Sequence, residues 1–226
     1  MRIAPTMLTC AFVAGLAASA SASTLDIPFS IGSGNSNEQF TIDRNNDAGN
    51  DIEIGIKAKD RFVGDIVPVG NVYNAVAGES DPGLALWNVD WSVDLGAGKT
   101  IDDYDVYLTV DFNTAVGNAD VSTFLIDGSA FLLPGQSINQ QSQNLGFGFW
   151  ALAPNYQAFD PFAPGEYEIG LTVFDDGADI SSAAALASVQ AFVNVAPIPL
   201  PPSLALGGLG LGALAFASRR ARRKTR

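Results

Sequence analysis

Strict alternation of apolar and polar residues is the feature that most limits what this 226-residue chain can fold into. From residue 87 to residue 95 every odd position is apolar and every even position is polar, and residues 103–112 repeat the pattern with the apolar side chains at even positions. Residues 167–173 and 187–195 alternate in the same way. Because successive side chains of a β-strand point to opposite faces, this period predicts four strands with one buried face each, and it places Trp87 and Trp91 in a core.

Weaker strand signals occupy residues 24–30, 38–42, 51–58, 62–67, 121–126 and 145–151. The glycines of residues 96–98 favour a hairpin between the first two alternating strands, and the polar stretch 136–144 and residues 148–165 are expected to be loops. Only the segment 180–190, rich in Ala and Ser, competes as a helix. Short one-sided strands must bury their apolar faces against a second sheet, so the chain is predicted to be all-β, a single antiparallel β-sandwich of seven to ten strands.

One strand adds a resemblance to this expectation. Residues 164–173 begin with Pro-Gly-Glu-Tyr and continue as an alternating strand. This order resembles the penultimate strand of immunoglobulin-like bacterial surface modules. The resemblance implies an immunoglobulin-like sandwich and no particular function.

The charge of the central part of the chain is strongly negative. Of the 12 Lys and Arg residues, Arg2 and six at the C-terminus lie outside residues 23–195, which leaves five cations against all 24 acids and a formal charge of −19. Nucleic-acid binding needs clustered cations and is therefore excluded. The chain has no His, and its single Cys, Cys10, precedes this region, so His-dependent and thiol catalysis and the usual zinc sites are excluded as well.

The N-terminus has the pattern of a secretory signal peptide. Arg2 supplies a positive start, residues 7–18 are apolar, and Ala20-Ser21-Ala22 is a small-residue cleavage site. Residues 1–22 are thus expected to direct the chain to Sec export and to be removed by signal peptidase. Cleavage after Ala20 is the alternative, because Ala18-Ser19-Ala20 has the same spacing.

The C-terminus, residues 196–226, carries three features in order: a proline-rich box at 197–202, an apolar run of 16 residues at 203–218, and a terminal cluster of arginines. A helix of that length spans roughly 24 Å, slightly less than the ~30 Å hydrocarbon layer of a bilayer. Cations directly after such a run stay on the cytoplasmic side, so residues 23–195 are expected to face outward. The four glycines of the run weaken it as a permanent anchor.

This order resembles the PEP-CTERM class of bacterial sorting tails, and within it the VPLPA-CTERM variant. The class implies recognition by an exosortase, a membrane enzyme that acts near the proline box. In this chain Pro202 takes the place of the final Ala of that pattern, and the alternative is an ordinary single-pass anchor with a stop-transfer sequence. The resemblance assigns the sorting signal to Pro197, Pro199, Leu200, Pro201, Pro202, Arg219, Arg220, Arg222 and Arg223.

A group of oxygen-bearing side chains suggests a calcium site. Calcium is bound by six to eight oxygens, and closely spaced Asp and Asn can present several from one turn. The candidate ligands are Asp43, Asn45, Asp47 and Asp51. The alternative is a solvated turn, because turns use the same residues. Five further acids fall on the predicted solvent-facing sides of strands, where bound cations would relieve their repulsion: Asp90, Asp94, Asp103, Asp105 and Asp111.

Aromatic residues between positions 148 and 165 suggest a second kind of site. Trp150 and Tyr156, with Phe159 and Phe162 nearby, are candidates for a flat sugar-binding platform that would hold extracellular polysaccharide. The alternative is that they pack over one end of the sandwich. Acids scattered over every turn single out no catalytic pair, so no enzymatic activity is expected.

These observations together predict an exported, non-enzymatic surface or extracellular-matrix protein that is held briefly at the inner membrane and processed through its C-terminal tail. The competing hypothesis is an extracellular carbohydrate-binding module.

Overall fold

The computed structural model describes residues 22–26, 36–46, 51–115, 121–125, 135–153 and 156–198, and it divides the chain into one compact unit of Met1–Ala196 and another of Pro197–Arg226. The described part is all-β, with two short 3-10 helices and no α-helix. Its elements are β1 (Ala22–Ser23), β2 (Phe40–Asn45), β3 (Ile52–Asp60), β4 (Gly64–Asp65), β5 (Val72–Val76), β6 (Glu79–Asp81), β7 (Leu84–Ala85), β8 (Trp87–Asp94), η1 (Ile101–Asp103), β9 (Tyr104–Asp111), β10 (Val121–Leu125), β11 (Ile138–Gln143), η2 (Gly148–Leu152), β12 (Gly165–Asp175) and β13 (Ala187–Ala196).

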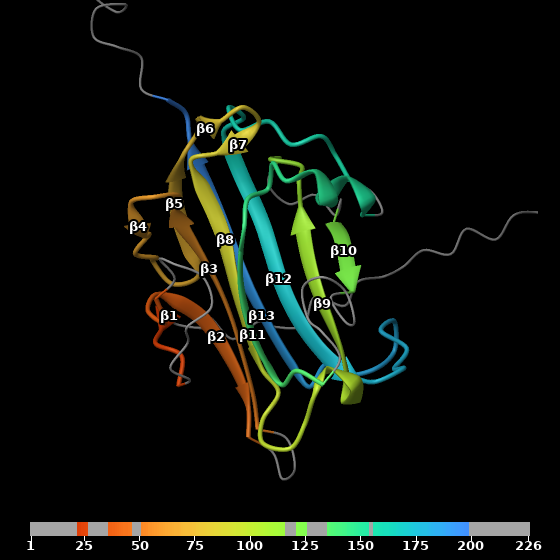
Figure 1. Cartoon of the computed structure of the whole chain (residues 1–226). Coiled ribbons are helices and arrows are strands. Elements are labelled where there is room, and N and C mark those ends of the chain that lie inside the picture. Colours follow the sequence, from red (N-terminus) through yellow and green to blue (C-terminus); the bar gives the residue numbers. More distant parts are fainter. Residues whose placement is uncertain are drawn as a thin grey trace, which may run out of the picture. The chain divides into compact units, whose positions relative to one another are not determined.

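The first large sheet has six strands in the order β1-β2-β3-β8-β11, with β4 paired to β3 (Figure 1). All of its pairings are antiparallel. Strands β3 and β8 form its centre, and their register places Ile54 opposite Val93 and Ile56 opposite Trp91. These alternate side chains are fully buried, so one face of the sheet is apolar along its whole centre.

The second large sheet has five strands in the order β10-β9-β12-β13-β5. Long antiparallel pairings join β12 to β9 and to β13, whereas β5 runs parallel to β13. The fold is therefore mixed rather than wholly antiparallel, which corrects the prediction. Strand β5 was not predicted, because the sequence Val-Tyr-Asn-Ala-Val is too short to give a clear period.

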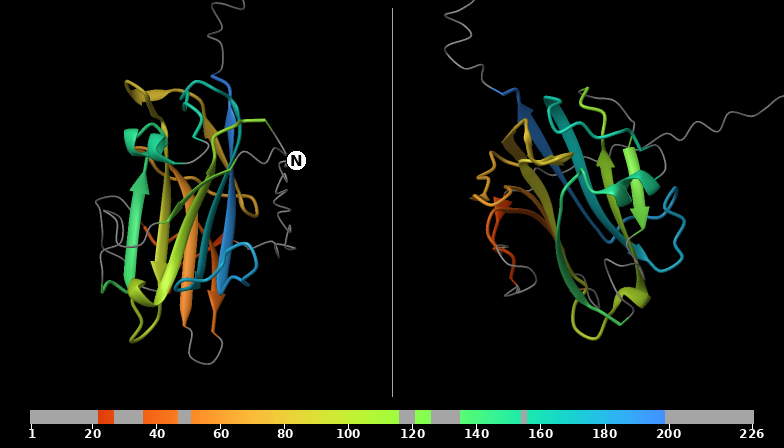
Figure 2. Two further views of the ribbon diagram at one scale, coloured as in Figure 1. Left: turned by 90° about the vertical axis from the view of Figure 1, so that its right-hand side faces the viewer. Right: turned by 45° about the horizontal axis from the view of Figure 1, so that its top comes forward.

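The apolar faces of both sheets contribute to one hydrophobic core. Strand β13 packs against β2 and β3, and β12 packs against β3, so the two sheets lie face to face as two layers (Figures 1 and 2). Trp87 and Trp91 are 1% and 0% exposed in this core, which confirms their predicted placement. Trp87 meets Tyr167 of the other sheet edge to face, with 5.4 Å between ring centroids.

The four strongly alternating segments are confirmed as β8, β9, β12 and β13, and the weaker segments 38–42, 51–58 and 121–126 contain strands of β2, β3 and β10. The predicted hairpin between β8 and β9 is wrong, because the two strands belong to different sheets. The connection crosses from one sheet to the other. It contains Gly96 and Gly98, which adopt positive φ angles, and the short helix η1, at which Thr100 and Asp103 form a capping box.

Five other segments differ from their predictions. Residues 138–143 of the expected polar loop form strand β11, which pairs with β8 although it has no apolar face. Residues 145–151, expected as a strand, end in the 3-10 helix η2. In the segment 24–30, the described residues 24–26 are not part of a strand. In the segment 62–67, only Gly64–Asp65 form a strand, β4. No helix forms in residues 180–190, because Ser188, Val189 and their neighbours pair with β12.

No helix in the described part of the chain is long and apolar enough to cross a membrane. The apolar run 203–218 and residues 1–21 of the expected signal peptide lie outside the described residues.

Candidate functional site

The unexpected feature of the structure is a buried polar layer on the side of the six-stranded sheet that faces away from the core. Five of its side chains define what we call the polar face: Lys57 and Lys59 of β3, Asp90 and Ser92 of β8, and Gln140 of β11. Each is at most 8% exposed. The register places Asp90 opposite Lys57, and Ser92 between Gly55 and Gln140. Alternation identified which side chains point away from the core, but the prediction that they meet solvent is wrong here.

Lys57 is the best satisfied member of the polar face. Its ammonium donates to the carbonyl oxygens of Ser36 and Glu38 at 2.8 and 3.1 Å, to the Ser36 hydroxyl at 3.1 Å, and to Asp65 Oδ1 at 2.7 Å. The Phe40 ring lies 4.6 Å from the same nitrogen. The Ser36 hydroxyl also bonds Asp65. A charged lysine can be buried when it is paired and hydrogen-bonded in this way.

The second pair, Lys59 and Asp90, is arranged differently. Lys59 Nζ lies 3.3 Å from Asp90 Oδ2, and the two side chains are 10% and 0% exposed. Neither carboxyl oxygen of Asp90 accepts a hydrogen bond of good geometry. Burial raises the pKa of Asp90 above its ordinary value, while the charge of Lys59 and the Ser142 hydroxyl act in the opposite direction. For this carboxyl the cost of burial therefore outweighs the groups that stabilise its ionised form.

Two neutral members of the polar face also lack hydrogen-bond partners. The Ser92 hydroxyl and both polar atoms of the Gln140 carboxamide are buried and unpaired. Each such atom costs free energy relative to its exposure in the unfolded chain. The face thus combines a satisfied ion pair with two neutral side chains, Ser92 and Gln140, that have no hydrogen-bond partner, and the contrast was not visible in the sequence. The available signal was two lysines at alternate positions of a strand whose other residues are Ile, Gly and Ala apart from Glu53 and Asp60.

The acids predicted on the solvent-facing sides of strands differ in burial and in hydrogen-bond partners. Asp105 and Asp111 are buried like Asp90, and they accept hydrogen bonds from the backbone nitrogens of Gly177 and Asn113. Burial, followed by the charge of Asp51, raises the pKa of Asp94, while its hydrogen bond from Gly96 opposes that shift. Asp103 is exposed and serves the cap of η1. These acids therefore form no shared row.

The proposed calcium ligands are also separated by their contacts. Asp43 Oδ2 accepts the backbone N–H of Ser188 at 2.7 Å, and Asn45 Nδ2 donates to the Leu186 carbonyl at 2.8 Å. Both side chains of β2 thus bind the backbone at the start of β13. Asp51 is exposed, and Asp47 lies outside the described residues. Among the residues that are described, no group of three or more His, Cys, Asp or Glu is arranged to hold a metal ion.

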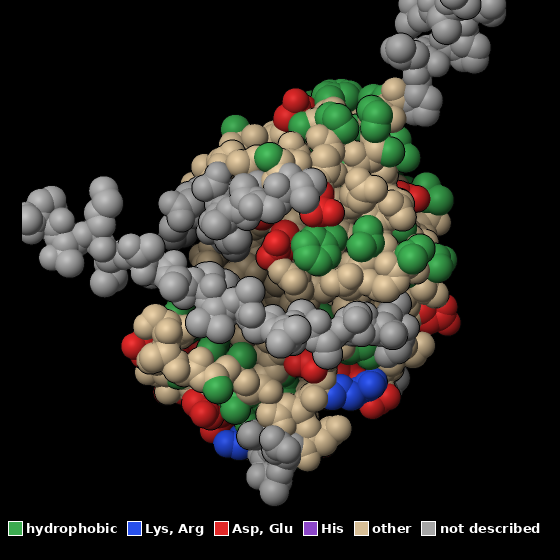
Figure 3. Space-filling model, turned by 180° about the vertical axis from the view of Figure 1, so that it is seen from behind, with side chains coloured by type: hydrophobic (Ala, Val, Ile, Leu, Met, Phe, Trp, Pro, Cys, Tyr) green, Lys and Arg blue, Asp and Glu red, His purple; other side chains and the backbone are tan. Residues whose placement is uncertain are grey.

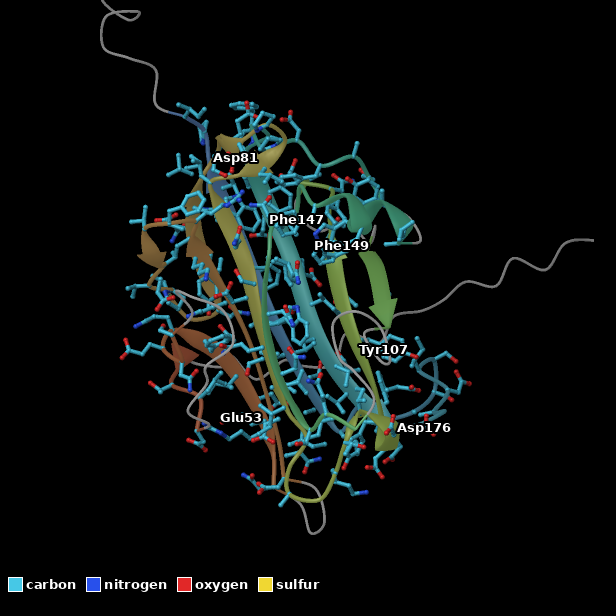
Figure 4. The ribbon with its side chains drawn as sticks, in the orientation of Figure 1. Glu53, Asp81, Tyr107, Phe147, Phe149 and Asp176 are labelled. Atoms are coloured by element: carbon cyan, nitrogen blue, oxygen red, sulfur yellow. The ribbon has the colours of Figure 1, made fainter. Side chains whose placement is uncertain are left out.

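Three of the four aromatic candidates, Trp150, Tyr156 and Phe159, pack in or against the core, whereas Phe162 is 49% exposed. Trp150 is 1% exposed, and its indole N–H donates to the Asn144 carbonyl at 2.8 Å. Phe112 contacts both Trp150 and Tyr156 edge to face, at 5.9 and 4.9 Å between centroids. A buried indole has no free face for a sugar ring, which corrects the proposed role of Trp150. Phe147 and Phe149, at the start of η2, lie with their ring centroids 6.2 Å apart (Figure 4).

The surface of the described domain is marked by its charge. Acidic side chains are scattered over the face shown in Figure 3, whereas Lys and Arg appear only near its lower end. Glu53, on the same side of β3 as Lys57, pairs with Arg44 and accepts the Asp26 N–H at 2.9 Å (Figure 4). A turn after β3 exposes four apolar side chains, Phe62, Val63, Val67 and Val69, each at least 71% exposed.

The residues of the expected sorting signal are almost entirely outside the described part of the chain. Pro197 is described as an irregular residue after β13, and Pro199, Leu200, Pro201, Pro202 and the arginines at 219–223 are not described. Comparisons with protein-family models, with curated proteins and with solved structures found no match to this chain.

Proposed function

We propose that this chain is an exported surface or extracellular-matrix protein without enzymatic activity, delivered and processed through its C-terminal tail. The observation that carries the proposal is the fixed order of proline box, uncharged apolar run and arginine cluster at residues 197–226. Cations after an apolar run favour the cytoplasmic side of a bilayer, which leaves the preceding domain outside. A signal-peptide pattern at the opposite end agrees with this orientation.

The proposed sequence of events has three steps. Signal peptidase removes residues 1–22 after Sec export, the apolar run holds the chain in the inner membrane, and an exosortase-type enzyme cuts near the proline box. The released part is an acidic domain, for which we propose an immunoglobulin-like β-sandwich. Its charge of −19 keeps it soluble outside the cell, where salt screens the repulsion between its acids.

Absence of catalysis is supported by composition rather than by geometry. Because the chain has no His and its one Cys is Cys10, residues 23–195 contain neither a histidine general base nor a thiol nucleophile. The burial of Trp150 also removes the main support for the alternative, a carbohydrate-binding module. Display or deposition in extracellular polymer is the role that remains best supported.

The arginine cluster gives the sharpest test. Replacing Arg219, Arg220, Arg222 and Arg223 together with Gln removes the stop signal, so we expect less membrane retention and less processed protein outside the cell. The same four positions changed to Lys keep the charge and should behave like the original chain if charge alone is read. Fractionation and immunoblotting report both outcomes. Unchanged localisation and unchanged mature size in the Gln variant would contradict the proposal.

A further inference from the structure

Lys59 and Asp90 hold an amine and a carboxyl in contact within the polar face. The two residues are diagonal neighbours on β3 and β8, because Lys59 lies opposite Asn88 and Lys57 lies opposite Asp90. Nζ is 3.3 Å from Oδ2, and the side chains are 10% and 0% exposed. Because Oδ2 is bonded to Cγ, the carbon that an amine would attack lies next to this contact, and groups held so close in a fixed geometry gain much of the benefit of intramolecular reaction.

Lys57 and Asp65 show what a stable ion pair looks like in the same sheet. The Lys57 ammonium is surrounded by four oxygen acceptors, and Asp65 is 20% exposed and bonded by Ser36 as well. Asp90, in contrast, is wholly buried and accepts no hydrogen bond of good geometry. Burial disfavours the charged form of this carboxyl, against the charge of Lys59, and thereby favours its taking up a proton.

We propose that Lys59 and Asp90 join in an intramolecular amide, an isopeptide bond between strands β3 and β8. The Lys59 amine attacks Cγ of the protonated Asp90 carboxyl, the C–N bond forms, and the carboxyl hydroxyl leaves with an amine proton as one molecule of water. No oxidant, reductant or second reactant is consumed. The Ser142 hydroxyl lies beside the carboxyl and accepts from Asn88 Nδ2 at 3.0 Å, so it is placed to carry the proton from nitrogen to the leaving oxygen.

The product suits its surroundings better than the reactants do. An amide has no charge to desolvate and keeps one donor and one acceptor, which the polar neighbours Ser142 and Asn88 can bind. The amide joins Nζ to Cγ, the carbon that carries Oδ2, so the 3.3 Å contact between Nζ and Oδ2 places the amine beside the atom it attacks, and the flexible lysine side chain absorbs the closure to the roughly 1.3 Å of an amide bond. The bond closes a loop through β4 to β7 and ties the two central strands of the six-stranded sheet together covalently.

Digestion of the full-length protein with trypsin tests this directly. Trypsin does not cleave after an acylated lysine, and no Lys or Arg lies between Arg61 and Lys99. The cross-linked chain should therefore yield residues 58–61 joined to residues 62–99, lighter than the two free peptides by one water. Fragmentation places the branch at Lys59 and Asp90. Processing at either end of the chain does not affect these peptides.

Two variants complete the test. Lys59→Arg keeps the charge but cannot form this amide, so it should give no branched peptide, whereas Lys57→Arg should keep it. Loss of water that persists in Lys59→Arg would show a cyclised aspartate instead and would overturn the proposal. If Lys59→Arg does not fold, the digest of the unmodified protein still decides. Free peptides 58–59, 60–61 and 62–99 at unaltered mass from folded protein would refute the bond.

Discussion

The two large sheets use the same alternation of residues in opposite ways. In the five-stranded sheet, burial alternates along β12 and β13, with core side chains buried and those between them partly or fully exposed. In the six-stranded sheet, eight of the nine residues of β3 are buried, and β8 is buried at six of eight positions. Alternation therefore shows which side of a strand joins the core, but not whether the other side meets water.

Charge follows the same division. The strands of the five-stranded sheet contain no Lys or Arg, whereas Arg44, Lys57 and Lys59 all lie on β2 and β3. Three of the five cations available to a domain with 24 acids are thus placed on one sheet. Buried acids in that sheet can pair with them, while the acids of the other sheet rely on backbone donors such as the N–H groups that bind Asp105 and Asp111.

Breaking the satisfied ion pair should have the largest effect. Lys57→Met removes the ammonium from Asp65 and from the carbonyls of Ser36 and Glu38, and we expect a loss of about 3 kcal/mol in the free energy of unfolding. Urea denaturation measures this value. The double variant Lys57→Met/Asp65→Leu should recover part of the loss, because it removes the stranded carboxylate as well.

Thr172→Ala is the matched change on the other sheet. Thr172 and Ser188 form an exposed side-chain contact at 3.2 Å on the outer side of β12 and β13, so the change should stay within about 0.5 kcal/mol. Equal losses of unfolding free energy in Lys57→Met and Thr172→Ala would contradict the proposed difference between the two sheets.

Replacing an unpaired polar side chain of the polar face by an apolar one should change the free energy of unfolding less, and in the opposite direction. Gln140→Met keeps the length of the side chain and removes two buried polar atoms that have no partner. We expect the free energy of unfolding to rise by about 1 kcal/mol, again by urea denaturation. Gln141→Met, one position along β11 and bonded to Asn139 at 3.1 Å, is the control and should not stabilise. A clear loss of stability in Gln140→Met would contradict this description of the polar face.

The smallest expected effect is a pH dependence in the five-stranded sheet. Burial raises the pKa of Glu168 above its ordinary value of 4.5; Gln190 lowers it, and the charges of Asp111 and Glu166 raise it further. The folded chain then binds the proton more tightly than the unfolded chain, so this contribution to stability falls as pH rises from the ordinary range through the raised value. Glu168→Gln should remove that part of the slope.

Asp179 provides a control of opposite sign for the pH series. Hydrogen bonds from the side chain and the backbone of Ser181 lower its pKa, so its contribution is lost as pH falls. Asp179→Asn should therefore lose stability relative to the original chain at neutral pH and match it in acid. Urea midpoints measured for both variants across the acid range would show the two opposed trends, and identical curves would contradict them.

The sequence allowed the main strands and the core to be predicted, because β8, β9, β12 and β13 each alternate over at least seven residues. It did not allow pairing to be predicted, since Gly96 and Gly98 serve a crossing between sheets as readily as a hairpin. Strand β11 was missed because the residues after Ile138 are polar on both sides, so the strand has no apolar period. The polar face was missed for a related reason: burial of Lys57 and Asp90 depends on tertiary contacts that no local pattern encodes.

The intact mass of the protein recovered from cells and from the medium tests the proposed route of export most directly. We expect the extracellular form to lack residues 1–22 and to end near the proline box at 197–202, while a cell-associated form still carries the arginine cluster. Recovery of the complete 226-residue chain from the cytosol, with both ends present, would contradict the account.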